Sequence, residues 1–94
     1  DGHFASLFPD FDELEAGLAL PGTHRCLPVQ TAASPHPRIS LTLDTLVRTR
    51  SLVLLAFGDA KRSVLADAAE GRGGYPVQAL LGQVQTPVRI AWAP

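Results

Sequence analysis

The sequence predicts an α/β fold built on a parallel sheet, and the clearest evidence lies between Arg38 and Leu81. In this region the apolar spacing changes from period two to helical spacing and back, with turn residues at each change. Residues 51–57 are almost continuously apolar, which is typical of a parallel strand covered on both faces. Gly58 follows directly, and helical spacing begins after it. A strand, a tight turn and a helix in succession are the unit from which α/β folds are built.

A shorter strand and a helical turn are predicted just before this unit. Ile39, Leu41 and Leu43 alternate with polar residues, which predicts a half-buried strand. Leu46 and Val47 then fit one short helical turn.

The helix after Gly58 has recognisable start and stop signals. Asp59 is the predicted N-cap, because its carboxylate can accept a hydrogen bond from an unpaired N–H group of the first turn. The helix is expected to run through Ala69, and Gly71 can supply the left-handed residue that ends it.

Two more elements are predicted toward the end of the chain. Residues 72–76 form a loop, and Pro76 suits the first turn of a helix that ends at Gly82. Val88, Ile90 and Trp92 then alternate as a final strand, with Trp92 packed at the sheet edge.

Residues 1–37 give weaker signals. A short helix is expected over 10–18, a strand over 25–31, and an extended loop over 34–37, where prolines restrict the backbone. Parallel strands separated by helices need neighbours on both sides, and too few strands are predicted to provide them. Residues 1–94 are therefore expected to form a single incomplete domain.

Composition argues against several classes of function. The 94 residues include 8 basic and 9 acidic side chains, a net charge of -1 without long runs of either sign, so neither nucleic acid nor a membrane is an expected partner. The single cysteine, Cys26, cannot form an internal disulfide, which suits a reducing compartment and predicts a cytoplasmic protein. Its side chain is expected to be a buried small hydrophobe. The longest apolar run, 52–57, is far shorter than the ~20 residues of a membrane helix. His24, Cys26 and His36 lack zinc-site spacing, so no metal and no cofactor are expected.

The opening residues, Asp1–Pro9, read DGHFASLFP and resemble the signature DGHTASLFP of the 6-phosphogluconolactonases, with Phe4 where the family usually has threonine. The resemblance continues through Pro37–Leu43 and Leu52–Leu65, and so covers essentially the whole chain. It implies the C-terminal part of a Rossmann-like three-layer sandwich with a mostly parallel sheet. It also implies hydrolysis of 6-phospho-D-glucono-1,5-lactone to 6-phosphogluconate in the pentose phosphate pathway, with a sugar phosphate as the small-molecule partner.

The same resemblance implies roles for four polar residues. His3 corresponds to the general base that activates water, and a neutral imidazole with a pKa near ~6.5 can accept a proton at neutral pH. Asp1 would orient or charge-stabilise that imidazole. Lys61 would bind the substrate phosphate in the first turn of a helix, where N–H groups and the helix dipole favour an anion. Arg38 would add a second phosphate contact.

Residue chemistry alone leaves a plainer interpretation open for each of these positions. His3 and Asp1 could belong to a mobile, solvated terminal segment. Lys61 could be a solvated helix lysine, because Gly-x-x-Lys is a common sequence. Arg38 could be a surface arginine at a strand end.

Two other functions stay open at this point. Glucosamine-6-phosphate deaminases and isomerases share the Asp-Gly-His start and the later lysine, but they have a glutamate five residues after the histidine, where this chain has Phe8. Lactone hydrolysis is preferred because phenylalanine cannot transfer a proton. Alternatively the chain is a non-catalytic fragment. Under either interpretation the N-terminal half of the same protein is the expected partner, and the isolated chain is expected to be inactive.

Overall fold

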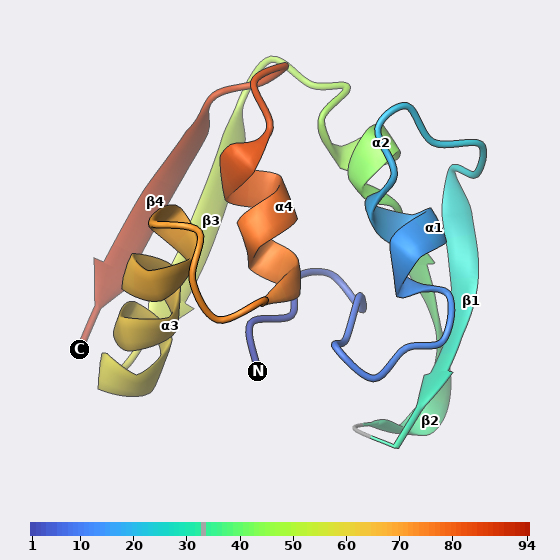
Figure 1. Ribbon diagram of the computed structural model, residues 1–94, viewed down its shortest axis with the longest axis horizontal. Coiled ribbons are helices and arrows are strands. Elements are labelled where there is room, and N and C mark those ends of the chain that lie inside the picture. Colours follow the sequence, from blue (N-terminus) through green and yellow to red (C-terminus); the bar gives the residue numbers. More distant parts are fainter. Residues whose placement is uncertain (33) are drawn as a thin grey trace.

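The computed structural model describes residues 1–32 and 34–94, and these ranges contain four helices and four strands (Figure 1). The elements form two groups, and the N-terminal segment runs between them. Within the described residues, the longest helix has 11 residues, and no helix is long and apolar enough to cross a membrane.

The first group is a two-stranded ribbon with two short helices. It contains α1 (Leu14–Leu18), β1 (Cys26–Thr31), β2 (Ser34–Leu41) and α2 (Leu43–Leu46). The two strands pair antiparallel, with an irregularity between Val29 and Thr31. The predicted strand over 25–31 and the helical turn near Leu46 are confirmed, whereas α1 is shorter than expected.

The second group is the predicted strand, turn and helix with a parallel partner strand. It contains β3 (Leu52–Phe57), α3 (Asp59–Ala69), α4 (Pro76–Gly82) and β4 (Val88–Ala93). Strands β3 and β4 are parallel, and the connection between them passes through both helices on one side of the sheet (Figure 1). The α/β class, the parallel sheet and the helix start at Pro76 are therefore confirmed.

Strand β3 is covered on one face only. Leu54 and Ala56 lie on the face that packs toward the core, while Val53, Leu55 and Phe57 are each more than half exposed. The prediction that this strand is buried on both faces is wrong for the described residues, because both helices of the group lie on the same side of the sheet.

The ribbon departs from the sequence predictions in three respects. Residues 34–37 belong to β2 rather than to a loop, since an edge strand with an irregular register tolerates proline. Leu43 begins α2 instead of continuing the strand. The buried face of β2 is also the opposite one, because Ser40 is 2% exposed and Ile39 is 77% exposed.

Two smaller predictions are corrected at single residues. The N-cap position of α3 is Gly58 rather than Asp59, which is the first helical residue. Cys26 is exposed rather than buried, because it faces outward at the start of β1. At the other end of α3, Gly71 has a φ of 76° directly after the C-cap Glu70, which confirms the predicted left-handed stop.

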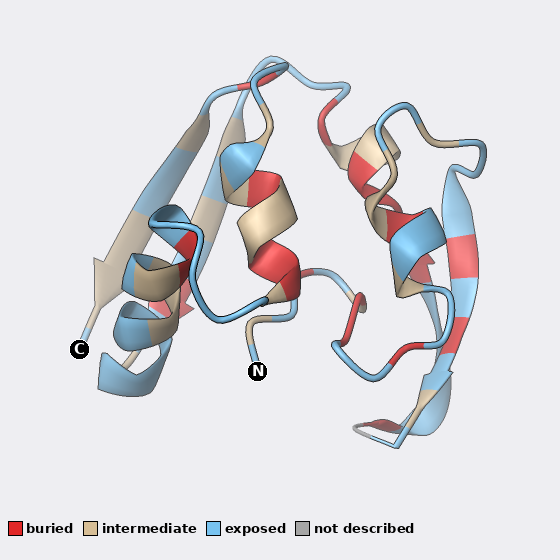
Figure 2. Cartoon of the chain, in the orientation of Figure 1, coloured by how far each residue is buried: buried red, intermediate tan, exposed pale blue. Residues whose placement is uncertain are grey.

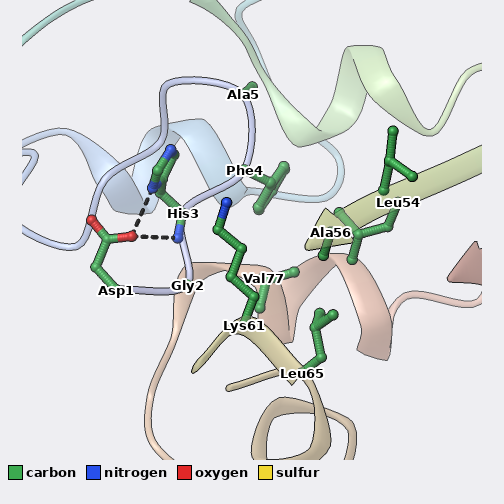
Figure 3. Close-up of a pocket in the computed structure, with 11 residues that line it drawn as sticks. Asp1, Gly2, His3, Phe4, Ala5, Leu54, Ala56, Lys61, Leu65 and Val77 are labelled. Atoms are coloured by element: carbon green, nitrogen blue, oxygen red, sulfur yellow. Dashed lines mark hydrogen bonds and ion pairs between the residues drawn. The ribbon is translucent and has the colours of Figure 1, made fainter. Parts of the chain in front are cut away.

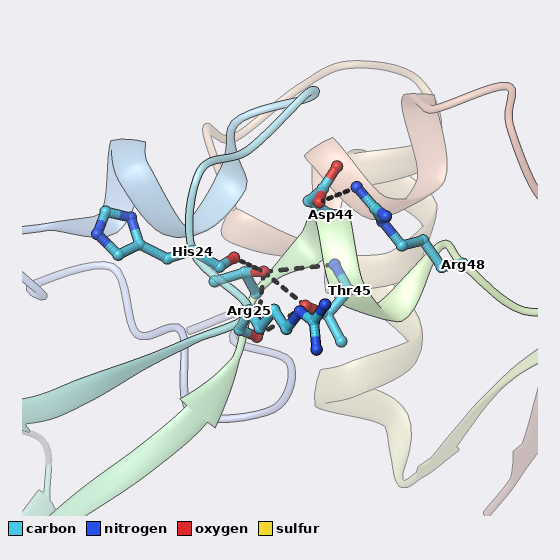
Figure 4. A network of polar contacts seen from close by, with 6 residues as sticks. His24, Arg25, Asp44, Thr45 and Arg48 are labelled. Carbon is cyan, nitrogen blue, oxygen red and sulfur yellow. Dashed lines mark hydrogen bonds and ion pairs between the residues drawn. The ribbon is translucent and has the colours of Figure 1, made fainter.

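Hydrogen bonds to backbone carbonyls fix the start of β1 against α2 (Figure 4). The Thr42 hydroxyl donates to the His24 carbonyl at 2.8 Å, and the Thr45 hydroxyl donates to the Arg25 carbonyl at 2.7 Å. Thr42 also accepts a hydrogen bond from the Thr45 backbone N–H and so caps α2.

One hydrophobic core joins the two groups, and the N-terminal segment supplies much of it (Figure 2). Phe4, Leu7, Phe8 and Phe11 are all buried in this core. They pack in one cluster with residues of β1, of α2 and its C-cap, of α3 and of α4, namely Leu27, Val29, Leu43, Val47, Ala68, Val77 and Leu80. The segment that includes His3 is therefore anchored by its own apolar side chains.

Candidate functional site

The Asp1 carboxylate holds His3 through two hydrogen bonds (Figure 3). Its Oδ1 atom lies 2.6 Å from His3 Nδ1 and accepts the His3 backbone N–H at 3.1 Å. A carboxylate can only accept a hydrogen bond from this nitrogen, so the proton of the neutral ring is on Nδ1. Nε2 is then the free proton acceptor, which is the arrangement that a general base requires.

Gly2 seats this pair on the first turn of α4. Its carbonyl accepts the Val77 backbone N–H at 2.9 Å, and its φ is 74°. A Cβ atom at this position would lie 2.5 Å from Tyr75 Cβ, far inside van der Waals contact. Only glycine allows both this backbone conformation and this close approach.

A tight turn fixes the chain on the other side of His3. The Leu7 N–H donates to the Phe4 carbonyl at 3.0 Å, and Ala5 within the turn has a φ of 49°. The Ser6 N–H donates to the hydroxyl of the buried Ser40 in β2 at 3.0 Å. This bond explains why Ser40 rather than Ile39 faces inward.

The ring of Phe8 contacts both the imidazole and Arg38. His3 and Phe8 stack with their ring centroids 4.3 Å apart and their planes at 27°. The Arg38 guanidinium carbon lies 5.8 Å from the Phe8 centroid, and Arg38 Nε donates to the Ser34 hydroxyl at 2.8 Å. Phe8 thus offers His3 an apolar surface instead of a second titratable group.

His3 and Asp1 line a cleft of about 320 Å³ between the N-terminal segment and the second group of elements. Lys61, in the first turn of α3, lines the same cleft and extends toward the segment of His3 (Figure 3). The remaining lining is mostly apolar and consists of Gly2, Phe4, Ala5, Leu54, Leu55, Ala56, Leu65 and Val77.

The surroundings lower the pKa of His3 below its ordinary value of 6.5. Partial burial is the main cause, and the positive charges of Lys61 and Arg38 act in the same direction. All of these disfavour the imidazolium, so the ring is neutral at neutral pH. A neutral imidazole whose Nδ1 bonds a carboxylate and whose side chain is 42% exposed can take a proton from a molecule in the cleft.

The structure brings together three of the four predicted site residues. His3, Asp1 and Lys61 share one cleft, whereas Arg38 lines a different hollow of the surface. The sequence indicates that Phe8 stands where the deaminases and isomerases have a glutamate. No signal in the sequence indicates that its ring stacks on His3. Among residues 1–32 and 34–94, no three His, Cys, Asp or Glu side chains gather as metal ligands would.

A family model described as "Glucosamine-6-phosphate isomerases/6-phosphogluconolactonase" matches residues 1–92 of the chain. The 6-phosphogluconolactonase of Pseudomonas putida is 40% identical over all of this chain and 38% of its own length. That of Caulobacter vibrioides is 44% identical over 99% of this chain and 40% of its own length. A crystal structure of a 6-phosphogluconolactonase from Shewanella baltica superimposes with a TM-score of 0.84 and 33% identity, covering 98% of this chain and 40% of that protein. The chain thus spans about 40% of the length of the relatives it matches.

Proposed function

The chain belongs to the glucosamine-6-phosphate isomerase and 6-phosphogluconolactonase family, and from this we propose that it supplies the general base of an enzyme that hydrolyses 6-phospho-D-glucono-1,5-lactone to 6-phosphogluconate. One observation supports the proposal most strongly. An imidazole bonded through Nδ1 to the Asp1 carboxylate lines the same cleft as the Lys61 ammonium. A base and a cation in one cleft suit an uncharged ester joined to a phosphate.

In the proposed reaction, His3 Nε2 removes a proton from water while the water oxygen attacks the lactone carbonyl carbon. The tetrahedral intermediate then collapses, and the bond from that carbon to the ring oxygen breaks. The imidazolium returns its proton to the departing ring oxygen, and the new carboxylic acid ionises and releases one proton to solvent. Asp1 stabilises the imidazolium between these two transfers and keeps Nε2 directed at the substrate.

Lys61 binds the substrate phosphate in this proposal. Its ammonium adds a point charge in the first turn of α3, where backbone N–H groups and the helix dipole also favour an anion. Arg38 is proposed as the second cation near the phosphate. In the described structure its guanidinium is held by Ser34, so direct contact requires it to leave that hydrogen bond.

Activity is proposed to require the rest of the family's domain, its N-terminal half. The exposed apolar side chains Val53, Leu55 and Phe57 leave one face of β3 without a packing layer in this chain. The complete enzyme, meaning this chain together with that half, would cover the face. We propose that the complete enzyme acts in the cytoplasm, which contains sugar phosphates and keeps a thiol such as that of Cys26 reduced.

The glucosamine-6-phosphate deaminase and isomerase activity is the second candidate within the family. Phe8 occupies the position at which that branch is expected to have an acid, and it stacks on His3. With an apolar ring there, the cleft has a base but no acid at that position to open a sugar ring.

A substrate comparison tests the proposed function. The complete enzyme should hydrolyse 6-phosphogluconolactone, with the reaction measured by the protons it releases. It should release no ammonia from glucosamine 6-phosphate under the same conditions. Deamination faster than lactone hydrolysis would refute the proposal in favour of the second candidate. This chain assayed alone should show no hydrolysis above the spontaneous rate, and full activity from it would refute the requirement for the remaining half.

A further inference from the structure

We propose that Trp92 is a positioning residue for Lys61, acting through the turn between β3 and α3. The inference rests on the proposed function, in which Lys61 binds the substrate phosphate. Trp92 does not line the cleft, and its indole hydrogen bond and its cation–π contact go to Gly58 and Arg62, which lie on either side of Lys61 in the sequence.

The end of β4 holds both backbone groups of Gly58. The Trp92 indole N–H donates to the Gly58 carbonyl at 2.8 Å, and the Gly58 N–H donates to the Ala93 carbonyl at 2.9 Å. Trp92 pairs with Ala56 across the parallel sheet, which places its side chain on the face of the sheet that α3 covers. The turn before α3 is therefore fixed by two successive residues of the neighbouring strand.

Trp92 also contacts the helix directly on the other side of Lys61. The Arg62 guanidinium carbon lies 4.8 Å from the centroid of the Trp92 ring, a cation–π distance. The Arg62 backbone N–H donates to the Gly58 carbonyl at 3.2 Å, so this one oxygen accepts from both the first helical turn and the indole. Lys61 thus lies in the sequence between Gly58 and Arg62, both of which contact the indole of Trp92.

The first turn of α3 lacks the usual means of fixing its geometry. Gly58, at the N-cap position, has a φ of 91° and no side chain to cap the helix. Open space surrounds the position that a Gly58 Cβ would take, with no atom of the described residues within 4 Å apart from its chain neighbours. The indole hydrogen bond therefore fixes the Gly58 carbonyl where no side chain packs around this residue, and it sets the direction in which Lys61 leaves the helix.

A double-mutant cycle in the complete enzyme tests this role. Trp92→Phe keeps an aromatic ring and removes the N–H donor. It should raise KM for 6-phosphogluconolactone about two- to tenfold, the effect of one lost hydrogen bond, with kcat within about twofold. Lys61→Ala should raise KM about 10- to 100-fold. In the Lys61→Ala background, Trp92→Phe should have no further effect on KM, because the residue it positions is gone.

Thermal unfolding will show whether Trp92→Phe disturbs folding. Arg62→Gln is a second variant that tests the same contact if it does. It should raise KM in the same direction and should also be silent in the Lys61→Ala background. Arg50→Gln, an exposed arginine that precedes β3 and does not line the cleft, is the control for lost charge and should leave KM unchanged.

The outcomes separate the two proposals. If Lys61→Ala raises KM but Trp92→Phe adds the same factor in both backgrounds, Trp92 is only structural and the inference is wrong while the proposed function stands. An unchanged KM for both Trp92→Phe and Arg62→Gln also overturns the inference alone. If Lys61→Ala itself leaves KM unchanged, the phosphate role of Lys61 and the positioning role of Trp92 both fail.

Discussion

Gly2→Ala should remove activity by displacing His3, although residue 2 has no reactive group. Gly2 has a φ of 74°, a region that alanine rarely adopts, and its added Cβ would meet Tyr75 Cβ at 2.5 Å and ring carbons of Tyr75 at 2.8 Å. The blocking atom is bound directly to the Tyr75 backbone and cannot rotate away. The segment with Asp1 and His3 must therefore move off the start of α4.

The loss of unfolding free energy in Gly2→Ala can be divided into two parts. Placing a residue with a Cβ in the left-handed region costs about 1–2 kcal/mol. Overpacking in a filled site adds about 1–3 kcal/mol. Gly74→Ala isolates the first part, because Gly74 has a φ of 62° and, apart from its chain neighbours, no atom of residues 1–32 and 34–94 lies within 4 Å of its added Cβ.

Chemical denaturation and lactone hydrolysis of the complete enzyme measure both effects. Gly2→Ala should lose about 2–5 kcal/mol of unfolding free energy, the sum of the two parts, and at least about tenfold in kcat/KM. Gly74→Ala should lose only the first part and keep its activity. Equal destabilisation by the two variants, or normal activity in Gly2→Ala, would refute the view that close packing on Tyr75 positions His3.

Three further predictions concern the core and the titrating groups. Leu7→Ala should lose about 2–5 kcal/mol of unfolding free energy, because Leu7 is 0% exposed. Val84→Ala, at a 99% exposed position, should change the unfolding free energy by less than about 0.5 kcal/mol. Losses of similar size for the two variants in chemical denaturation would contradict the assignment of Leu7 to the core. Because the pKa of His3 is lowered, kcat/KM should rise with pH through an inflection below 6.5. Lys61→Gln should shift that inflection to higher pH by removing a positive charge. A wild-type pH–rate profile with its inflection above 6.5 would contradict a lowered pKa of His3. Asp1→Asn should reduce kcat by at least about tenfold with little change in KM, as steady-state kinetics would show, and an unchanged kcat would remove Asp1 from the site.

Much of the second group of elements could be predicted from local sequence. The apolar run before Gly58, the helix through Ala69 and the proline start at Pro76 are local signals, and each has a direct counterpart in the structure. The position of Lys61 in the first turn of a helix followed from the same local pattern. Its approach to His3 did not, because that depends on where the N-terminal segment docks.

The errors occurred where tertiary contacts outweigh local pattern. Ile39 has the residue type of a core position, but the hydroxyl of Ser40 is needed inside to bind the Ser6 N–H, so the strand presents its apolar side outward. The apolar run of β3 correctly predicted a strand, but the described residues cover only one of its two faces. Periodicity shows which faces a strand can bury and does not show which segment covers them. Arg38 was expected at the phosphate, but it lines a different hollow from Lys61, and no local sequence pattern indicates this.

The most direct test of the account is lactone hydrolysis by His3→Ala in the complete enzyme, measured as proton release at neutral pH from 6-phosphogluconolactone. The control is His36→Ala, which removes an exposed imidazole from β2. If His3 Nε2 is the general base, His3→Ala should lose at least about 100-fold in kcat with an unchanged unfolding transition, and His36→Ala should match the wild type. A His3→Ala enzyme that folds normally and keeps a kcat within about threefold of the wild type would contradict the assignment of His3 as the base.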